Sequence, residues 1–593
     1  MNETDNKSRF GRPRGALAIL ALILIAAVCL NLLWLHTHHI PVYAGHGTML
    51  SGIHAFRLLL EDPLRGIGKF LCLKDYNLYQ VSSVLVASLF GLSYRSMVFT
   101  STIYYLLLII FAYDTARMLG NRLGGLAAAV SIMLFPAVFG WSRIYCTFIA
   151  GMFFPLLGFW LLLSSRAFTK AAPTMAFALL CALSMRLGET VSENIMTLFV
   201  LFFPAAYFFI FQMIRGRTKH RRILALSLSA AALFVIVLLT DYRYIYMAIG
   251  YLNFEAIDQR AIKYTPGNIA ADPSAIWAYF LIMWHENLSP PFAILTLAAL
   301  GITAWRPTAR QGALLIYFLV PLVLLSLIAK KNYNYIFALL PTCAVLIGVA
   351  VAKVARGRWG GVATAAIAVI GSFTFVNLSF MYQPNPTELF GAPTDYRRYF
   401  QSWEVPVHMP FAASSALMTI AELAAEKSAS SHGASILIMA PYTSTDAEML
   451  HFLLELKNKG GSLRVYFPVF DISLHIVEGF DRPAPPENFQ PDMIINFSIL
   501  EVLQKQRADG IIMQMFEGYQ YLLDYPYDVK TLDQLVRRWA VSLDSIPWDL
   551  YVHDRISIIS QPFFTVTHFD LLVKNVDDSH KPLLNLINGG AVH

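Results

Sequence analysis

The sequence has few charged residues. Asp, Glu, Lys and Arg make up only 14% of its 593 residues, whereas 56% are hydrophobic. Together with a mean hydropathy of +0.54, so little charge excludes a soluble globular chain of this length. The sequence also has no Walker loop, no GxGxxG after an apolar run and no internal repeat, so nothing in it supports nucleotide-driven transport. Its five cysteines predict no disulfide framework, because four fall in apolar segments and only Cys72 lies elsewhere.

What the sequence does contain is a series of about eleven apolar segments, each close to the ~20 residues that cross a ~30 Å bilayer core. The predicted spans are residues 15–35, 96–116, 123–140, 145–164, 174–188, 195–213, 222–240, 290–305, 312–329, 333–352 and 360–381. The first span is too long for a signal-peptide core and no cleavage site follows it, so we expect it to remain as an anchor.

Basic residues alternate between successive loops, and this alternation predicts the orientation of the chain. They are Lys7, Arg9, Arg12, Arg14, Arg117, Arg122, Arg166, Lys170, Arg215, Arg222, Arg306, Arg310, Lys353, Arg356 and Arg358. The positive-inside rule places these loops in the cytoplasm. We therefore expect a multi-pass protein of a bacterial inner membrane with a cytoplasmic N-terminus. The net charge of +7 then reflects topology and anionic lipid, and nucleic acid is not expected as a partner.

Three regions interrupt the regular series of spans. Two are long outer loops, residues 36–95 and 241–289, and the third is a polar region that begins at Gln383. In this last region, residues 435–440 and 463–470 are typical of buried strands, with a predicted helix from Thr445 to Lys459 between them, and residues 492–497 and 556–573 predict further strands. The expected architecture is a basic N-terminus (1–14), a mainly α polytopic membrane domain (15–382) and a C-terminal extracytoplasmic α/β domain (383–593).

Several short motifs in the membrane domain occur in a recognisable order. They are an apolar re-entrant stretch at 81–92, Leu89–Ser93, Arg117–Gly120 with Gly124-Gly125, Phe135-Pro136, Trp141–Arg143, Asn287–Pro290, Lys331–Tyr335 and Leu340-Pro341. In this order the chain resembles the GT-C glycosyltransferases, and more closely the protein-mannosyltransferase and aminoarabinose-transferase group (glycosyltransferase family 39 and relatives). The resemblance implies a GT-C-like fold and transfer of a sugar from a polyprenyl-phosphate donor to a cell-envelope acceptor at the outer face.

The resemblance also implies an acidic general base early in the first outer loop and a second acid near the fourth span. Here those places read Tyr43–Gly47 and Tyr145–Thr147, without a carboxylate. An acceptor hydroxyl still needs a base. His46 is one candidate because imidazole titrates near neutrality. Other candidates are Asp75, Glu189 and Glu193.

Glu189 and Glu193 are four residues apart, which places them on one face of any helix there. Glu61 and Asp62 are further outer-loop acids, and each acid alone is also typical of a solvated loop. The alternative is a chain without catalysis, which binds a lipid-linked glycan or organises a membrane or periplasmic protein partner. A lipid or glycan transporter is the third class, although the spans carry almost none of the interior charge that it would need.

Phosphate recognition is indicated by Lys330 and Lys331, the exception to the alternation of basic loops. They lie at the outer end of a span beside Tyr333 and Tyr335, where a polyprenyl phosphate would supply an anion. Arg143, Arg186 and Arg243 also fall at outer ends of spans and could join them. The alternative is that the lysines extend to lipid headgroups.

A divalent cation is the one cofactor that the sequence suggests. The histidines concerned are His36, His38, His39, His46 and His54. Neither a cysteine nor a carboxylate completes a familiar ligand spacing among them. The alternative is an interfacial loop whose histidines contact headgroups.

Overall fold

The computed structural model describes residues 13–37, 46–72, 77–187, 191–215, 220–239, 272–328, 331, 333–354, 358–380, 421–422, 434–439, 453–454, 463–466, 493–496, 551–560 and 565–574. The chain divides into two compact units. The first comprises residues 1–35, 62–91 and 95–408, and the second comprises residues 36–61, 92–94 and 409–593.

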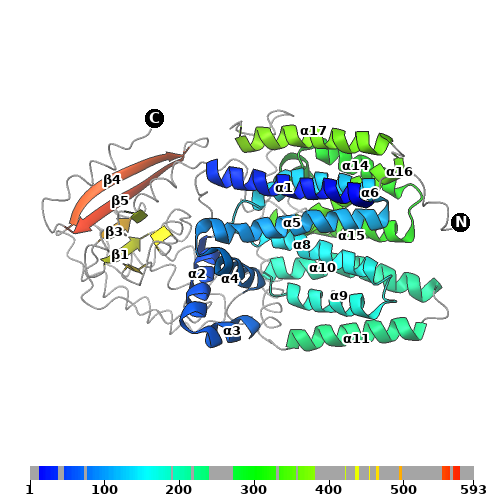
Figure 1. Cartoon of the computed structure of the whole chain (residues 1–593), viewed down its shortest axis with the longest axis horizontal. Coiled ribbons are helices and arrows are strands. Elements are labelled where there is room, and N and C mark those ends of the chain that lie inside the picture. Colours follow the sequence, from blue (N-terminus) through cyan, green and yellow to red (C-terminus); the bar gives the residue numbers. More distant parts are fainter. Residues whose placement is uncertain are drawn as a thin grey trace. The chain divides into compact units, whose positions relative to one another are not determined.

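The first unit is helical, and its long helices run in roughly one common direction (Figure 1). Its elements are α1 (Pro13–Thr37), α3 (Pro63–Cys72), α4 (Leu78–Phe90), α5 (Tyr94–Leu119), α6 (Arg122–Leu134), α7 (Pro136–Trp141), α8 (Phe148–Ser164), α9 (Ala171–Ser184), α10 (Val191–Arg215), α11 (His220–Leu239), η2 (Pro273–Trp277), α13 (Ala278–Ile282), η3 (Met283–Asn287), α14 (Pro290–Ala304), α15 (Ala309–Leu327), η4 (Tyr333–Leu339), α16 (Leu340–Val354) and α17 (Arg358–Phe380). Every predicted apolar segment coincides with one or more of these helices.

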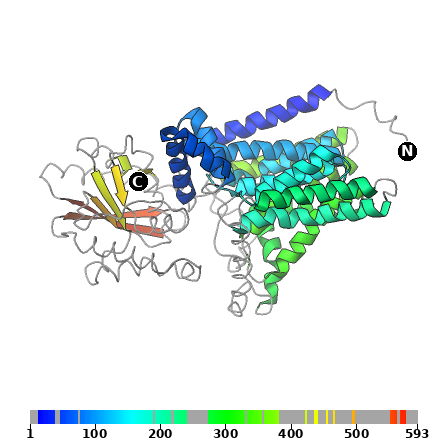
Figure 2. The ribbon, with the colours of Figure 1, turned by 90° about the horizontal axis from the view of Figure 1, so that it is seen from below.

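Within the described residues, six helices are long and apolar enough to cross a membrane: Gly15–His36, Tyr94–Leu119, Met196–Ile214, Ala309–Leu327, Asn334–Val354 and Trp359–Ser379. The expectation of a multi-pass membrane protein is therefore confirmed, whereas the count of eleven spans stays a prediction. In Figure 2, α1 runs along the margin of the helical unit. In agreement, only 22% of the span in α1 and 28% of that in α17 is buried, against 94% for the span that ends in α16.

Proline explains why one predicted span is two helices. The span expected over residues 123–140 ends as α6 at Leu134 and restarts as α7 at Pro136. Phe135 between them is extended (φ −68°, ψ 126°), because a following proline disfavours the helical conformation. The chain therefore bends just before the segment that carries Arg143.

Glycines allow α6 and α16 to pack closely. A Cβ atom on Gly124 would overlap the carbonyl oxygen of Gly348, and a Cβ atom on Gly348 would overlap that of Gly124. One turn away, a Cβ atom on Gly120 would lie 2.6 Å from the Cβ of Ala352. Small residues four apart let two membrane helices approach at backbone distance. This close crossing holds α6 and α16 together.

The second unit contains α2 (His46–Glu61) and a five-stranded sheet. The strands are β1 (Ala434–Met439), β2 (Leu463–Tyr466), β3 (Met493–Asn496), β4 (Tyr551–Ser560) and β5 (Thr565–Lys574), in the order β2-β1-β3-β5-β4. β1 is parallel to both β2 and β3, with Ile436 opposite Val465 and Leu437 opposite Ile494, whereas β5 is antiparallel to β3 and β4.

The strands fall where the sequence predicts them. Ile436, Leu437 and Ile438 are all buried, and since neighbouring residues of a strand point to opposite faces, both faces of the sheet are covered at β1. Parallel β1 and β2 require a crossover connection. The helix predicted for it, Thr445–Lys459, lies outside the described residues except for Leu453 and Leu454, so the α/β class of this unit stays a prediction.

Candidate functional site

One end of the helical unit gathers buried polar side chains. It includes the last turns of α1 and α17, the first half of α5, the start of α4, and the segment 142–147 between α7 and α8. Arg117 on α5 and Arg358 on α17 lie at the opposite end, the basic end of these helices. We call the end that carries the buried polar side chains the distal end; the alternation of basic loops predicts that it is the outer one.

Arg143 is the most unusual residue of the distal end, because its side chain is completely buried. Nη1 donates a hydrogen bond to Ser379 Oγ at 2.9 Å, and Nε lies 3.5 Å from Asn31 Oδ1. Nη2 has no hydrogen-bond acceptor among the described residues, and no described carboxylate forms an ion pair with the guanidinium. A buried cation normally has a counter-ion, so Arg143 has the properties of an anion-binding group.

Three aromatic rings enclose the guanidinium. Its Cζ lies 5.0 Å from the ring centroid of Trp34, 4.9 Å from that of Phe139 and 4.9 Å from that of Phe375. Ring faces attract a cation, but they offer no charge neutralisation. Burial lowers the pKa of Arg143 to about 9, so the group still carries its charge at neutral pH.

The backbone around Arg143 is held by a buried hydrogen-bond network. Asn31 Nδ2 on α1 donates to Ser142 Oγ at 2.8 Å, and Ser142 Oγ donates to the carbonyl of Phe139 at 2.8 Å. Asn31 therefore contacts both Ser142 and Arg143 through its amide group. This network ties the distal end of α1 to the segment that carries the arginine.

A second network consists of hydroxyl groups on α4, α5 and the 142–147 segment. The hydroxyls of Tyr79 and Ser101 are hydrogen-bonded to each other, and Ser101 Oγ donates to the carbonyl of Ile144 at 2.5 Å. Ser83 Oγ lies 2.8 Å from Tyr145 Oη, and the rings of Tyr79 and Tyr145 are 5.0 Å apart. At the place where the resemblance implies an acid, the chain thus has a buried tyrosine bound to a serine.

Lys331 is buried rather than extended towards solvent. Its ammonium lies 2.6 Å from the carbonyl oxygens of Ser326 and Ile328 and 3.4 Å from that of Leu325, at the C-terminal end of α15. The nitrogen also lies 5.6 Å from the ring centroid of Tyr279. A lysine there stabilises the carbonyl end of a helix, and burial lowers its pKa to about 8. All three ammonium protons therefore have carbonyl partners.

The other predicted site residues are only partly described. Arg186 is buried, and its carbonyl accepts a 2.7 Å hydrogen bond from the amide of Leu78 at the start of α4. Tyr335 is buried on η4. Lys330, Asp75, Glu189 and Arg243 lie outside the described residues, and the side chains of His46 on α2, Glu193 on α10 and Tyr333 on η4 are not described. Arg143 and Arg186 therefore come from segments that adjoin α4, α7 and α8.

Metal-ligating side chains do not gather in the described ranges: no group of three His, Cys, Asp or Glu residues occurs there. His38 and His39 lie outside those ranges, and the side chains of His46 and His54 are not described. The divalent-cation site thus stays a prediction.

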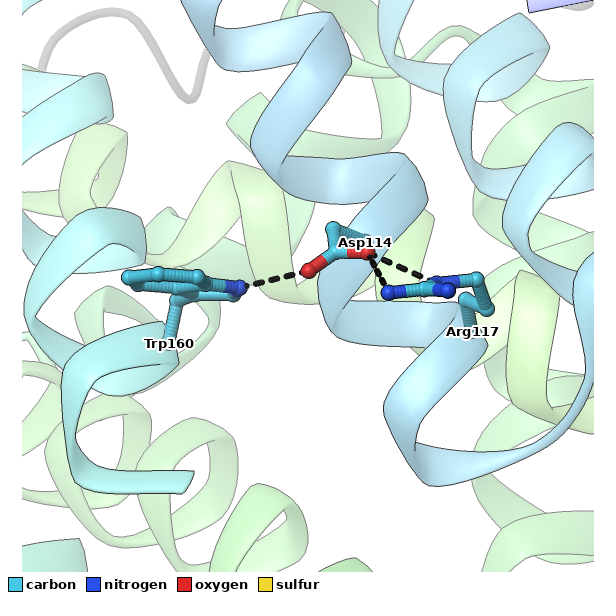
Figure 3. A network of polar contacts seen from close by, with 3 residues as sticks. All are labelled: Asp114, Arg117 and Trp160. Atoms are coloured by element: carbon cyan, nitrogen blue, oxygen red, sulfur yellow. Dashed lines mark hydrogen bonds and ion pairs between the residues drawn. The ribbon is translucent and has the colours of Figure 1, made fainter. Parts of the chain in front are cut away.

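The ion pair between Arg117 and Asp114 belongs to the basic end of the helices. Asp114 Oδ1 accepts from Arg117 Nε at 2.7 Å, while Trp160 Nε1 donates to Asp114 Oδ2 at 2.8 Å (Figure 3). This carboxylate therefore links α5 to α8. Since it lies on the same turn of α5 as the basic loop residue Arg117, it is not at the distal end.

Two polar residues that the sequence analysis did not single out lie on η3, a single π-helical turn. The turn is closed by the amide of Leu288 and the carbonyl of Met283 at 3.0 Å. His285 is buried and Glu286 is half-buried on it, and burial lowers the pKa of His285. π-turns are frequent at functional sites. The available signal was the polar run His285–Asn287 directly before the Asn287–Pro290 motif.

No protein-family model matches the chain, and no curated protein matches it either. Among solved structures, the crystal structure of ArnT from Cupriavidus metallidurans bound to undecaprenyl phosphate has a TM-score of 0.50 at 12% identity, and the match covers 82% of this chain and 94% of that one. The apo oligosaccharyltransferase from Archaeoglobus fulgidus has a TM-score of 0.39 at 10% identity, covering 83% of this chain and 70% of that one. Mycobacterial arabinofuranosyltransferase AftD has a TM-score of 0.38 at 13% identity, covering 91% and 41%.

At 12% identity, the likeness to ArnT shows the fold alone. The chain has a GT-C-type fold, as the order of its motifs predicts.

Proposed function

We propose that this protein is a membrane glycosyltransferase that moves a sugar from a polyprenyl-phosphate donor to a cell-envelope acceptor at the outer face of the inner membrane. The observation that carries the proposal is the likeness to ArnT over 82% of the chain, because that solved structure is bound to undecaprenyl phosphate. A fold hosts a function only through its site. The buried cation at the distal end, Arg143, supplies the group that a phosphate needs.

The proposed reaction is a direct displacement. The acceptor hydroxyl oxygen attacks the anomeric carbon of the sugar and forms the new glycosidic bond. The bond from that carbon to the phosphate oxygen breaks, and polyprenyl phosphate leaves with the electron pair. A base takes the hydroxyl proton, and cationic groups stabilise the charge that develops on the phosphate. Direct displacement predicts inversion at the anomeric carbon.

We assign the donor phosphate to the cations that the sequence predicts at outer span ends. Arg143 has the strongest support, because one of its donor nitrogens lacks an acceptor in the described part of the chain. Arg186 is buried and lies next to the start of α4, because its carbonyl accepts a hydrogen bond from the amide of Leu78. Lys331 would have to exchange a carbonyl partner for the phosphate. Lys330, Arg243, Tyr333 and Tyr335 complete the proposed set.

The base remains among His46, Asp75, Glu189 and Glu193, and Glu286 joins them. Glu286 is half-buried on the π-turn η3, which packs against α7, the helix that leads to Arg143. Glu286 thus lies at the distal end, where a base must lie to take a proton from an acceptor at the outer face.

A second candidate function is a glycolipid-binding or assembly scaffold without turnover. The observation that favours it is Tyr145, whose buried hydroxyl is bonded to Ser83 where the resemblance implies an acid. In this case the distal end would bind the lipid-linked sugar, and no bond would break.

The test is sugar transfer from a panel of radiolabelled polyprenyl-phosphate sugars in membranes that contain equal amounts of wild type, His46→Ala, Glu189→Ala, Glu286→Gln, Arg143→Met or Lys331→Ala. A glycosyltransferase is expected to lose transfer in Arg143→Met and in one base variant. The matched control is Trp305→Phe, at an exposed residue of the basic end, which should transfer like wild type. Absence of transfer from every donor, together with donor binding that needs Arg143, would instead establish the scaffold.

A further inference from the structure

The surroundings of Arg143 indicate from which side an anion reaches it. Its hydrogen-bond and ring partners come from three elements: Asn31 and Trp34 on α1, Phe139 on α7, and Phe375 and Ser379 on α17. Of these, α7 is buried along its whole length. The other two elements, α1 and α17, flank the guanidinium and reach the surface of the helical unit.

Both flanking helices present apolar side chains outward beside the residues that touch Arg143. On α1, Leu33 is 48% exposed next to the buried Trp34, and on α17, Val376 is 46% exposed next to the buried Phe375. In a membrane protein such residues face lipid. The guanidinium therefore lies behind α1 and α17, two helices that present exposed apolar side chains at this level.

We propose that Arg143 binds the phosphate of a membrane lipid that enters sideways from the bilayer, between the distal ends of α1 and α17. The site and the route follow from the geometry, whereas the identity of the lipid as a polyprenyl phosphate rests on the proposed function. Trp34 and Phe375 would move apart to admit the phosphate, and Nη2 would donate to one of its oxygens. The chain of the lipid would stay in the hydrocarbon region, outside the two helices.

A lipid fits this site better than a free anion for two reasons. The guanidinium has no exposed surface, so an aqueous ion would have to cross an apolar wall without its hydration shell. A lipid brings its phosphate to the same wall within the bilayer, and its apolar chain needs no transfer from lipid to water. The shared chemistry is a phosphate oxygen, and lipid phosphate and inorganic phosphate are the two sources to separate.

The experiment uses the full-length protein in lipid nanodiscs, with a photoreactive benzoylphenylalanine at Leu33 or at Val376. The matched control position is Phe202 on α10, which is 66% exposed and belongs to another candidate span. The probes are radiolabelled undecaprenyl phosphate and radiolabelled phosphatidylglycerol, each with and without millimolar inorganic phosphate as competitor.

Labelling by a lipid phosphate at positions 33 and 376 is expected to exceed that at 202 at least tenfold and to withstand inorganic phosphate. It should fall to the control level in Arg143→Met, and Arg143→Lys, which keeps the charge without the planar fork, should retain part of it. A monodisperse peak in size-exclusion chromatography verifies that each variant is folded. If Arg143→Met is not folded, the labelling of Arg143→Lys tests whether the lipid phosphate needs the guanidinium.

Equal labelling at all three positions, labelling that ignores both Arg143 variants, or displacement by inorganic phosphate would each overturn the inference. Labelling by phosphatidylglycerol alone, with the same dependence on Arg143, would uphold the lipid site and its route while contradicting the polyprenyl donor of the proposed function.

Discussion

Replacing Arg143 by methionine is expected to leave the protein folded and to remove its stabilisation by lipid phosphate. The guanidinium makes one good hydrogen bond, to Ser379, and faces three rings. A hydrogen bond to a charged group contributes about 1.5–3 kcal/mol, and a desolvated ring contact contributes about 2 kcal/mol. Burying the ion costs several kcal/mol, which is of the same size. Methionine is apolar, flexible and packs well against rings, so the free energy of unfolding should change by less than about 2 kcal/mol.

The effect on ligand binding is expected to be larger. Removing one partner of a buried, hydrogen-bonded charge pair costs about 2–5 kcal/mol, which is at least about 30-fold in Kd. The assay is thermal unfolding in detergent with undecaprenyl phosphate at about 100 times the wild-type Kd, where the wild type gains about 2.7 kcal/mol. A variant with a 30-fold higher Kd gains less than about 1 kcal/mol under the same conditions.

Two results would refute this reasoning. If Arg143→Met gains as much stability from the lipid as the wild type, the guanidinium is not the phosphate ligand. If the variant without lipid is less stable by more than about 4 kcal/mol, the interactions of the arginine outweigh the cost of its burial, and its role is structural.

Three further predictions concern other parts of the helical unit. The pKa of Lys331 is about 8 in the folded chain, against an ordinary value of 10.5, so between these pH values the unfolded chain binds more protons than the folded chain. The free energy of unfolding should therefore rise with pH across this window in the wild type but not in Lys331→Met, and thermal unfolding at pH 7.5 and 10 measures the difference. Gly124→Ala should destabilise by about 1–3 kcal/mol, whereas Gly151→Ala, with open space for a Cβ, should be neutral or slightly stabilising; equal effects on urea unfolding would contradict the packing argument. Trp160→Phe should cost about 1.5 kcal/mol through the lost bond to Asp114, and much less in an Asp114→Asn background, which a double-mutant cycle measures.

The helices of the membrane unit are predictable because their signal is local. A run of apolar residues of the right length is visible without knowledge of its neighbours, and each expected span coincides with one or more helices. The break at Phe135 was also visible in principle, since it depends only on Pro136. The short helix α3 and the π-turn η3 were not predicted, because neither has the length of a span.

The site was predicted less completely, because its contacts join distant parts of the chain. Arg143 was one of several cations at outer span ends, and nothing local distinguishes it from Arg186. Its burial follows from Asn31, 112 residues before it, and Ser379, 236 residues after it. The carbonyl partners of Lys331 lie within six residues of it in the sequence. Their convergence on the ammonium nevertheless depends on how the chain turns after α15.

The hydroxyl network, too, depends on contacts that the sequence alone does not show. The absence of an acid at Tyr145–Thr147 was visible in the sequence, but its replacement was not. Tyr145 meets Ser83, and Tyr79 meets Ser101, only after α4 has packed against α5 and the 142–147 segment. The sequence therefore predicts what the site lacks, and the structure adds what occupies the place.

In the proposed reaction, polyprenyl phosphate leaves as a sugar is transferred. The most direct measurement is the release of radiolabelled undecaprenyl phosphate from labelled undecaprenyl-phosphate sugars by the purified protein in liposomes that contain cell-envelope acceptors, with the transferred sugar counted in parallel. We expect one polyprenyl phosphate to be released for each sugar transferred, and both products to be lost in Arg143→Met. Sugar donors that bind the wild type but stay intact in the presence of every acceptor would contradict it.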